Sequence, residues 1–241
     1  MMHLAAAVVA VFPLFTDKLE GHCDCMYLDR RGLVTTGRGN LYDPWPMVSA
    51  RRDPWTIDGV LASPMQVATE WHEVKARQDL VTASYPTRRA ITRLRLSEDA
   101  IDALTVERLT ENANIIAGRI RGWDGLPPDV QLAVMSIVWA CGAEVQFPRM
   151  FAAIESGDYA TAATESEMAH IEWTFANGMK ALATSEAAAR AKAGVQVGIA
   201  LDKQEDVNPG LTPRNAINKS LLLSAATDPT ELHWPSVEGS T

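Results

Sequence analysis

Two carboxylates and one hydroxyl occur at short, fixed spacing near the start of the chain. Glu20 is followed nine residues later by Asp29, and Thr35 comes six residues after Asp29. A protonated carboxyl can give its proton to the leaving oxygen of a sugar, while an ionised carboxylate handles water or the positive charge that develops on the ring. These residue types at this spacing therefore indicate cleavage of a glycosidic bond.

The sequence before Glu20 predicts a short helix. Pro13 suits the first turn of a helix, where its missing N–H has no cost, and apolar residues follow it at helical spacing. Gly21 would end this helix, because glycine tolerates a positive φ angle. Glu20 would then lie on the last turn of the helix, at the edge of the next element.

The sequence after Gly21 predicts a β-hairpin. Residues 26–28 and the β-branched stretch at 33–36 predict two strands. The turn between them would carry Asp29, with Gly32 at a position that needs a positive φ angle. Asp29 on the turn and Thr35 on the second strand are expected to face the helix end that carries the acid.

Four glycines complete a longer pattern with the three polar residues: Gly21, Gly32, Gly37 and Gly39. The resulting pattern, E-G-x7-D-x2-G-x2-T-x-G-x-G, resembles the catalytic signature of the phage-type lysozymes, the T-even phage group of glycoside hydrolase family 24. That family usually ends the pattern with His. This chain has Asn40 there, so any charge pairing of that His is absent.

Later segments resemble the helices of the same family, in the same order: a helix start at 97–104, a central buried helix at 131–142, two helices at 147–154 and 157–163, and a late helix start at 211–216. In the family the late helix offers an arginine that pairs with the catalytic Glu, and Arg214 is the candidate here. Thr212 would be the N-cap of this helix and Pro213 its first residue.

The resemblance implies an α+β fold, mostly α, of the lysozyme type, with a cleft between a small β-hairpin lobe and a larger helical lobe. Residues 1–241 would form a single lysozyme-like domain. Residues 14–63 would make the hairpin lobe with an inserted loop. Residues 64–230 would make the helical lobe, with an inserted helical arm at about 171–207.

The same resemblance implies a glycoside hydrolase, a lysozyme or muramidase that cleaves the β-1,4 bond between N-acetylmuramic acid and N-acetylglucosamine in peptidoglycan. Such a bacteriolytic enzyme degrades the cell wall and serves as a phage endolysin. Glu20 would be the general acid, and Asp29 and Thr35 would position water on the opposite face of the sugar, which suits inversion. The four glycines, Asn40 and Arg214 would support the site. Neither a cofactor nor a metal is required.

Three alternatives stay open. A lytic transglycosylase needs the acid but no water-positioning pair, so the presence of Asp29 and Thr35 argues against it. A catalytically inactive lysozyme-fold protein, as a structural or binding component of a phage particle or injection machine, fits the negative charge and Asn40. The third alternative is a different glycan, such as chitin.

Composition limits the partners. The chain has 241 residues, of which 47% are hydrophobic, so it can bury a core in one or two lobes. Its net charge of −8 argues against a nucleic-acid partner, because phosphate binding needs a basic stripe. Glycan strands of peptidoglycan are the expected partner. Three arginines near the motif either offset the acidity beside the cleft or are solvated hairpin charges: Arg30, Arg31 and Arg38.

Residues 4–15 form an apolar run that is too short to span a bilayer. This run is expected to be a helix that packs on the C-terminal lobe, with an export or membrane-arrest signal as the alternative. The chain has three cysteines, an odd number without the spacing of a disulfide framework, and this predicts reduced thiols. The expectation is therefore synthesis in the bacterial cytoplasm without a signal peptide. The protein would then act on the cell wall in the periplasm or be carried on a phage or injection particle.

Cys23 and Cys25 would share one face of an extended strand and are not expected to bridge each other easily. His22, Cys23, Asp24 and Cys25 offer metal-ligating atoms, but strong zinc sites use a second spaced pair of ligands. A structural role is therefore favoured over a metal site.

Two additional stretches, at about 41–95 and 171–207, stand outside the family pattern. The first contains Asp-Pro-Trp twice, so that Trp45 and Trp55 are either sugar-stacking platforms or anchors for a long loop. A helix is expected at 64–82 after the start signal Ser63-Pro64. The second stretch is rich in alanine, which predicts a long helix or helical hairpin for packing or for docking of a protein partner.

Overall fold

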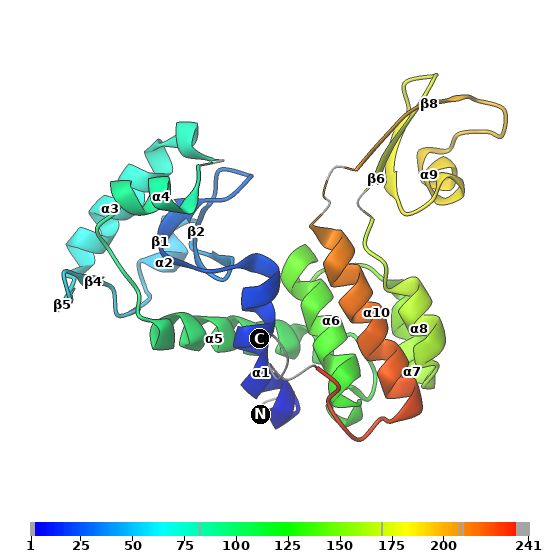
Figure 1. Cartoon of the computed structure of the whole chain (residues 1–241), viewed down its shortest axis with the longest axis horizontal. Helices are drawn as coiled ribbons and strands as arrows, with labels where there is room; N and C mark the ends of the chain where they lie inside the picture. Colours follow the sequence, from blue (N-terminus) through cyan, green and yellow to red (C-terminus); the bar gives the residue numbers. More distant parts are fainter. Residues whose placement is uncertain (1–2, 82, 170, 207, 209, 235–241) are drawn as a thin grey trace, which may run out of the picture. The chain divides into compact units, whose positions relative to one another are not determined.

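The computed structural model describes residues 3–81, 83–169, 171–206, 208 and 210–234 (Figure 1). It is 53% helical and 14% strand, with ten α-helices and small sheets among the described residues. The predicted α+β class with mostly α structure is therefore confirmed. The chain divides into two compact units, one of Val9–Glu111 and one of Met1–Val8 together with Asn112–Thr241.

The first helix is longer than predicted. Helix α1 spans Ala6–Glu20, so Pro13 lies inside it and not in its first turn. The apolar stretch before Pro13 is itself helical, and Val8 and Phe12 are fully buried. Burial of such side chains offsets the roughly 3 kcal/mol that an interior proline costs a helix. Among the described residues, no helix combines the length and apolar character needed to cross a membrane.

The predicted hairpin is present and is extended by a third strand. Strands β1 (Cys23–Leu28), β2 (Val34–Gly37) and β3 (Asn40–Leu41) form an antiparallel sheet in that order. The turn contains Gly32 with φ +72°, and a side chain there would collide with Gln78. The positive φ angle explains the glycine, because the Gln78 side chain could move aside.

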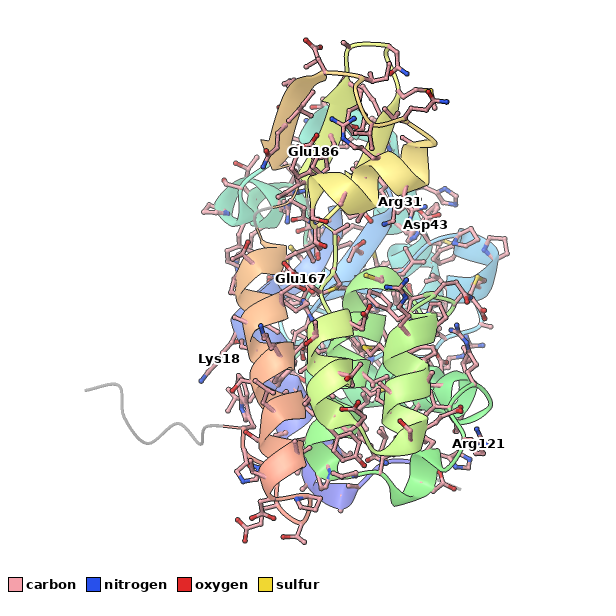
Figure 2. The ribbon with its side chains drawn as sticks, turned by 90° about the vertical axis from the view of Figure 1, so that its right-hand side faces the viewer. Lys18, Arg31, Asp43, Arg121, Glu167 and Glu186 are labelled. Carbon is pink, nitrogen blue, oxygen red and sulfur yellow. The ribbon has the colours of Figure 1, made fainter. Side chains whose placement is uncertain are left out.

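The first additional stretch covers this sheet. It contains α2 (Trp45–Val48), the small hairpin β4 (Thr56–Ile57) and β5 (Val60–Leu61), α3 (Pro64–Ala76), a 3-10 turn (Gln78–Leu80) and α4 (Tyr85–Ile91). Helices α3 and α4 both contact β1. Asp43, labelled in Figure 2, accepts from the Val34 N–H at 3.0 Å and pairs with Lys75 of α3 at 2.6 Å. This pair fastens α3 to β2.

Helix α3 begins as predicted and ends early. Ser63 is its N-cap in a capping box with Gln66, and Pro64 is its first residue. The predicted end at residue 82 is wrong, since Arg77 leaves the helical conformation with φ −90° and ψ 55°. Helix α5 (Glu98–Ala117) starts behind Ser97, whose hydroxyl accepts from the Ala100 N–H at 3.3 Å.

Four helices of the second unit match predicted segments. They are α6 (Pro128–Cys141), α7 (Pro148–Ser156), α8 (Tyr159–Glu165) and α10 (Leu211–Thr227), preceded by a 3-10 turn at Trp123–Gly125. Helix α10 contacts α6 and α8 (Figure 1). Its start differs from the prediction: Gly210 is the N-cap, so Thr212 and Pro213 lie in the first turn. Pro213 is tolerated there because the first four N–H groups of a helix have no partner within it.

The predicted helical arm at 171–207 is wrong. Strands β6 (Ile171–Phe175), β7 (Lys180–Ala183) and β8 (Leu201–Asp206) form an antiparallel sheet in the order β7-β6-β8. Only α9 (Glu186–Ala193) is helical. Gly178 turns the chain between β6 and β7 with φ +81°, and the alternating burial of Trp173 and Phe175 marks a strand. The high alanine content obscured this alternation.

Candidate active site

Glu20 is the last residue of α1, and it is exposed. Gly21 follows with φ +64°, and its N–H donates to the Asp17 carbonyl at 2.8 Å, which closes the helix. A side chain at Gly21 would meet no neighbour, so the positive φ angle explains the glycine. The sequence correctly placed Glu20 at a helix end.

Asp29 holds the hairpin turn together. Its Oδ1 accepts from the backbone N–H groups of Arg31 at 2.8 Å and Leu33 at 2.9 Å. Within the described part of the chain, no hydrogen bond reaches the second oxygen, Oδ2. The carboxylate is half-buried. One oxygen therefore shapes the turn while the other remains available to a water molecule or a sugar hydroxyl.

Thr35 lies on β2 directly opposite Tyr27 of β1. Residues opposite each other in an antiparallel pair share one face of the sheet. Thr35 is only 4% exposed, and its hydroxyl donates to the Leu33 carbonyl at 3.2 Å. A hydroxyl oxygen keeps its acceptor capacity after donating, so Thr35 can still receive one hydrogen bond.

Tyr27 lies opposite Thr35, and the charges of both motif carboxylates act on it. Burial raises the pKa of its hydroxyl, and the negative charges of Glu20 and Asp29 raise it further. The Arg88 guanidinium opposes them and lies 4.4 Å from the ring centroid. Both carboxylates therefore lie within electrostatic reach of one side chain, although one comes from the helix end and the other from the hairpin turn.

Arg38 fastens the elements beneath the site. Its guanidinium is 4% exposed and pairs with Asp17 of α1 at 3.2 Å, Glu98 of α5 at 2.5 Å and Asp102 of α5 at 2.6 Å. His22 adds contacts to Asp17 at 3.0 Å and Glu98 at 3.5 Å. The arginine thus connects the turn after β2 to the last turns of α1 and to the start of α5.

Two glycines of the motif produce the turn that directs Arg38 inward. Gly37 has φ +58° and Gly39 has φ +82°. A side chain at Gly37 would lie 3.1 Å from Asn40 Nδ2 and 3.3 Å from Ile101. Asn40 itself is 6% exposed, and its Nδ2 has no hydrogen-bond partner among the described residues. Asn40 is therefore a buried amide without a charge.

Of the three motif arginines, only Arg38 has a buried role. Arg30 and Arg31 are exposed on the hairpin turn. The sequence left open whether these charges are solvated or serve the cleft. The solvated option is wrong for Arg38, because it is a buried ion-pair centre, and the option that it serves the cleft stays a prediction.

Arg214 is buried on α10. It is 3% exposed, and its Nη1 donates to the Ser136 carbonyl at 3.0 Å and to the Ser136 hydroxyl at 3.2 Å. Asn215 instead bonds the backbone of Met168 at 3.0 and 3.1 Å. Arg214 and Glu20 belong to different units, and their predicted pairing stays a prediction.

The two loop tryptophans have different roles. Trp55 is 1% exposed, and its Nε1 donates to the Tyr42 hydroxyl at 2.9 Å, so it is an anchor as one alternative predicted. Trp45 is half-buried against Trp71 and His72. It lines a cavity of about 250 Å³ together with Trp55 and Arg52. The stacking alternative stays a prediction for Trp45.

Among the described residues, one group of three adjacent side chains offers metal-ligating atoms within 4.8 Å of one another: Cys23, Asp24 and Cys25. Asp24 is already engaged with Arg89, and Arg95 lies 3.7 Å away. These two cations offset the carboxylate charge that a metal ion would need.

Sequence reasoning missed Tyr27 and Arg38. Tyr27 precedes Asp29 by two residues, so strand alternation alone could have placed them on one face. Nothing in the sequence indicates the partners of Arg38, because two of its acids lie 60 and 64 residues away. Comparisons of the chain with protein-family models, with curated proteins and with solved structures return no match.

Proposed function

We propose that this chain is a peptidoglycan hydrolase with a phage-type lysozyme fold, a muramidase that cleaves the β-1,4 bond between N-acetylmuramic acid and N-acetylglucosamine. The observation that carries the proposal is the arrangement of Glu20 at the end of α1 with Asp29 and Thr35 on the hairpin that follows it. Two carboxylates from separate elements, with a hydroxyl on the same hairpin as one of them, suit acid-assisted glycoside cleavage.

Each side chain has a role that follows from its position. Glu20, exposed at the helix end, gives its proton to the glycosidic oxygen. Asp29 keeps its turn through Oδ1 and orients water through Oδ2. Thr35 accepts a hydrogen bond from the same water and fixes its direction of attack. Arg38 holds the end of α1 against the turn after β2 through Asp17.

We also propose a route by which the protein reaches its substrate. The protein is made in the bacterial cytoplasm and meets peptidoglycan in the periplasm, as an endolysin or on an injection particle. Its acidic surface is repelled by the anionic cell envelope, which suits delivery at close range better than free diffusion.

A second candidate is a catalytically inactive lysozyme-fold protein that binds glycan as part of a phage particle. It is favoured by two contacts: the turn N–H groups occupy Asp29 Oδ1, and the buried Thr35 hydroxyl donates to the Leu33 carbonyl. Both side chains therefore stabilise the hairpin, which would explain their presence in a protein without catalytic activity.

Digestion of purified peptidoglycan sacculi tests the proposal. Wild-type protein should release muropeptides with reducing ends. Glu20→Gln should lower the rate by about 10²–10⁴-fold, because it keeps the shape and removes the transferable proton. Glu73→Gln on α3 is a matched control, since Glu73 is also an exposed glutamate of the same unit.

Three results would contradict the proposal. Muropeptides with anhydro ends would identify a lytic transglycosylase. Intact sacculi that nevertheless retain the protein in a pull-down would identify the binding component. Equal rates for Glu20→Gln and Glu73→Gln would remove Glu20 from the reaction.

A further inference from the structure

Cys23 and Cys25 are close enough to react with each other. Their sulfur atoms lie 3.2 Å apart, and both residues are buried, at 5% and 0% exposed. The sequence predicted that two cysteines on one strand face would not bridge easily. In the structure, the two sulfurs are not held apart by the strand. They need to approach by only about 1.2 Å to reach the disulfide length of about 2.05 Å.

A β-bulge brings the two side chains together. Cys23 pairs with Gly37 and Tyr27 pairs with Thr35, so Asp24, Cys25 and Met26 all oppose Thr36 alone. A regular strand would separate Cα atoms two residues apart by about 6.4–6.8 Å, the upper end of the disulfide range. A bulge bends the strand and shortens this separation.

The neighbouring side chains favour the ionised, thiolate form of one of the two cysteines. The two thiols share a hydrogen bond in which either sulfur can be the donor, and this bond lowers the pKa of Cys25. The charge of Arg95 lowers the pKa of Cys25 further, while burial and the charge of Asp24 raise it. The hydrogen bond with Cys25 and burial both raise the pKa of the Cys23 thiol. The pair therefore offers an attacking thiolate beside a thiol that can complete the bridge.

We propose that Cys23 and Cys25 are a thiol–disulfide exchange site that accepts a low-molecular-weight disulfide such as oxidised glutathione. The Cys25 thiolate attacks one sulfur of the disulfide, so that a mixed disulfide forms and one thiolate leaves. Cys23 then attacks the Cys25 sulfur and expels the second thiolate. The two protein thiol protons end on the two small thiols, and the protein is oxidised by two electrons.

Access to the buried sulfurs comes from the start of the strand. Gly21 and His22, just before β1, are exposed, and Cys23 is the first residue of the strand. Opening of this terminal segment exposes both sulfurs without unfolding the rest of the unit. A bridge formed there fixes the bulge midway between Glu20 and Asp29 along the chain.

Intact-mass analysis of the full chain tests the site. Cys141 is the third free thiol, so the experiment uses the Cys141→Ser background. The folded protein is incubated with oxidised glutathione, quenched with acid, denatured and labelled with a maleimide. We expect the loss of two hydrogens and no maleimide label. Dithiothreitol should restore two labels.

A matched variant separates bridge formation from simple accessibility. Adding Cys25→Ser should stop the reaction, leaving Cys23 as a free thiol or as one glutathione adduct. Circular dichroism checks that this variant folds, and Cys23→Ser replaces it if it does not.

Two outcomes would overturn the proposal. In the first, the Cys141→Ser protein unfolded in guanidinium is fully oxidised, but the folded protein, incubated for the same time, still takes two maleimide labels. The other is a glutathione adduct that persists on Cys23 or Cys25 while both cysteines are present.

Discussion

The chain contains two three-stranded antiparallel sheets, β1–β3 and β6–β8, that differ in what surrounds them. Strands β1 and β2 bury Met26, Leu28 and Val34 in a core shared with residues as distant as Trp55 and Ile101. Strands β6–β8 belong to a separate core that lies wholly within residues 171–201. The first sheet depends on the rest of its unit, whereas the second is stabilised mostly by its own segment.

The charges of the two sheets differ in the same way. Arg38 beside the first sheet is buried and pairs with acids on α1 and α5. Around the second sheet, Lys180 pairs with Glu172 and Lys203 with Glu205, on partly or fully exposed side chains. Among the described residues, polar groups held by distant parts of the chain are found beside the first sheet, as a catalytic site requires.

The largest expected effect is loss of activity from the first sheet. Asp29→Asn keeps an oxygen for the turn but removes the charge, so we expect about 10²–10⁴-fold slower sacculus hydrolysis. Stability should change by less than about 1 kcal/mol, because the turn bonds can still form. Asp202→Asn in β8 is the control and should leave the rate unchanged. Loss of less than tenfold would restrict Asp29 to its structural role.

Trp173→Ala tests whether the second sheet is independent. Trp173 is 7% exposed and its Nε1 donates to the Ala183 carbonyl at 3.0 Å. Its removal should lower the free energy of unfolding by about 3–5 kcal/mol. Hydrogen exchange should therefore rise throughout β6–β8 while β1–β3 stay protected. Leu182→Ala, on the exposed side of β7, is the control. Loss of protection in both sheets would disprove the independence.

Arg38→Met tests the long-range anchoring of the first sheet. The substitution keeps the side-chain length and leaves Asp17, Glu98 and Asp102 without their cation. We expect a loss of about 2–4 kcal/mol in the free energy of unfolding, reduced from the value for a fully buried pair because these acids are partly exposed. Lys180→Met, which breaks the exposed pair with Glu172, should cost at most about 1 kcal/mol. Equal losses in the two variants would contradict the comparison.

The smallest effect is a pH dependence carried by Glu70 of α3. Its carboxylate accepts from the backbone N–H groups of Arg93 and Leu94 at 2.7–3.1 Å, yet burial raises its pKa. A raised folded-state pKa means that the folded protein binds more protons than the unfolded chain. The stability from Glu70 is thus complete below the unfolded pKa of about 4.5 and falls as pH rises through the folded value.

Urea unfolding at several pH values measures this dependence. Glu70→Gln should remove the decline in stability above pH 4.5, and Glu73→Gln on the same helix should retain it. A decline that is identical in wild type and Glu70→Gln would assign the effect to another group.

Local chemistry determined much of the fold in advance. The ends of α1 and α7 are set by glycines with positive φ, the start of α3 by Ser63 and Pro64, and the hairpin turn by Asp29 and Gly32. These features depend on neighbours within a few residues, so the sequence contains all the information they need. The motif spacing likewise predicted a helix end and a hairpin for Glu20, Asp29 and Thr35.

The tertiary structure decided what depends on distant neighbours. Packing outweighed the proline within α1, alternating burial outweighed alanine propensity in β7, and three acids from two helices made Arg38 a buried anchor. The contact between Cys23 and Cys25 likewise depends on a bulge defined by pairing with β2. Such outcomes are set by burial and by charges that meet only after folding, and no local pattern of residue types encodes them.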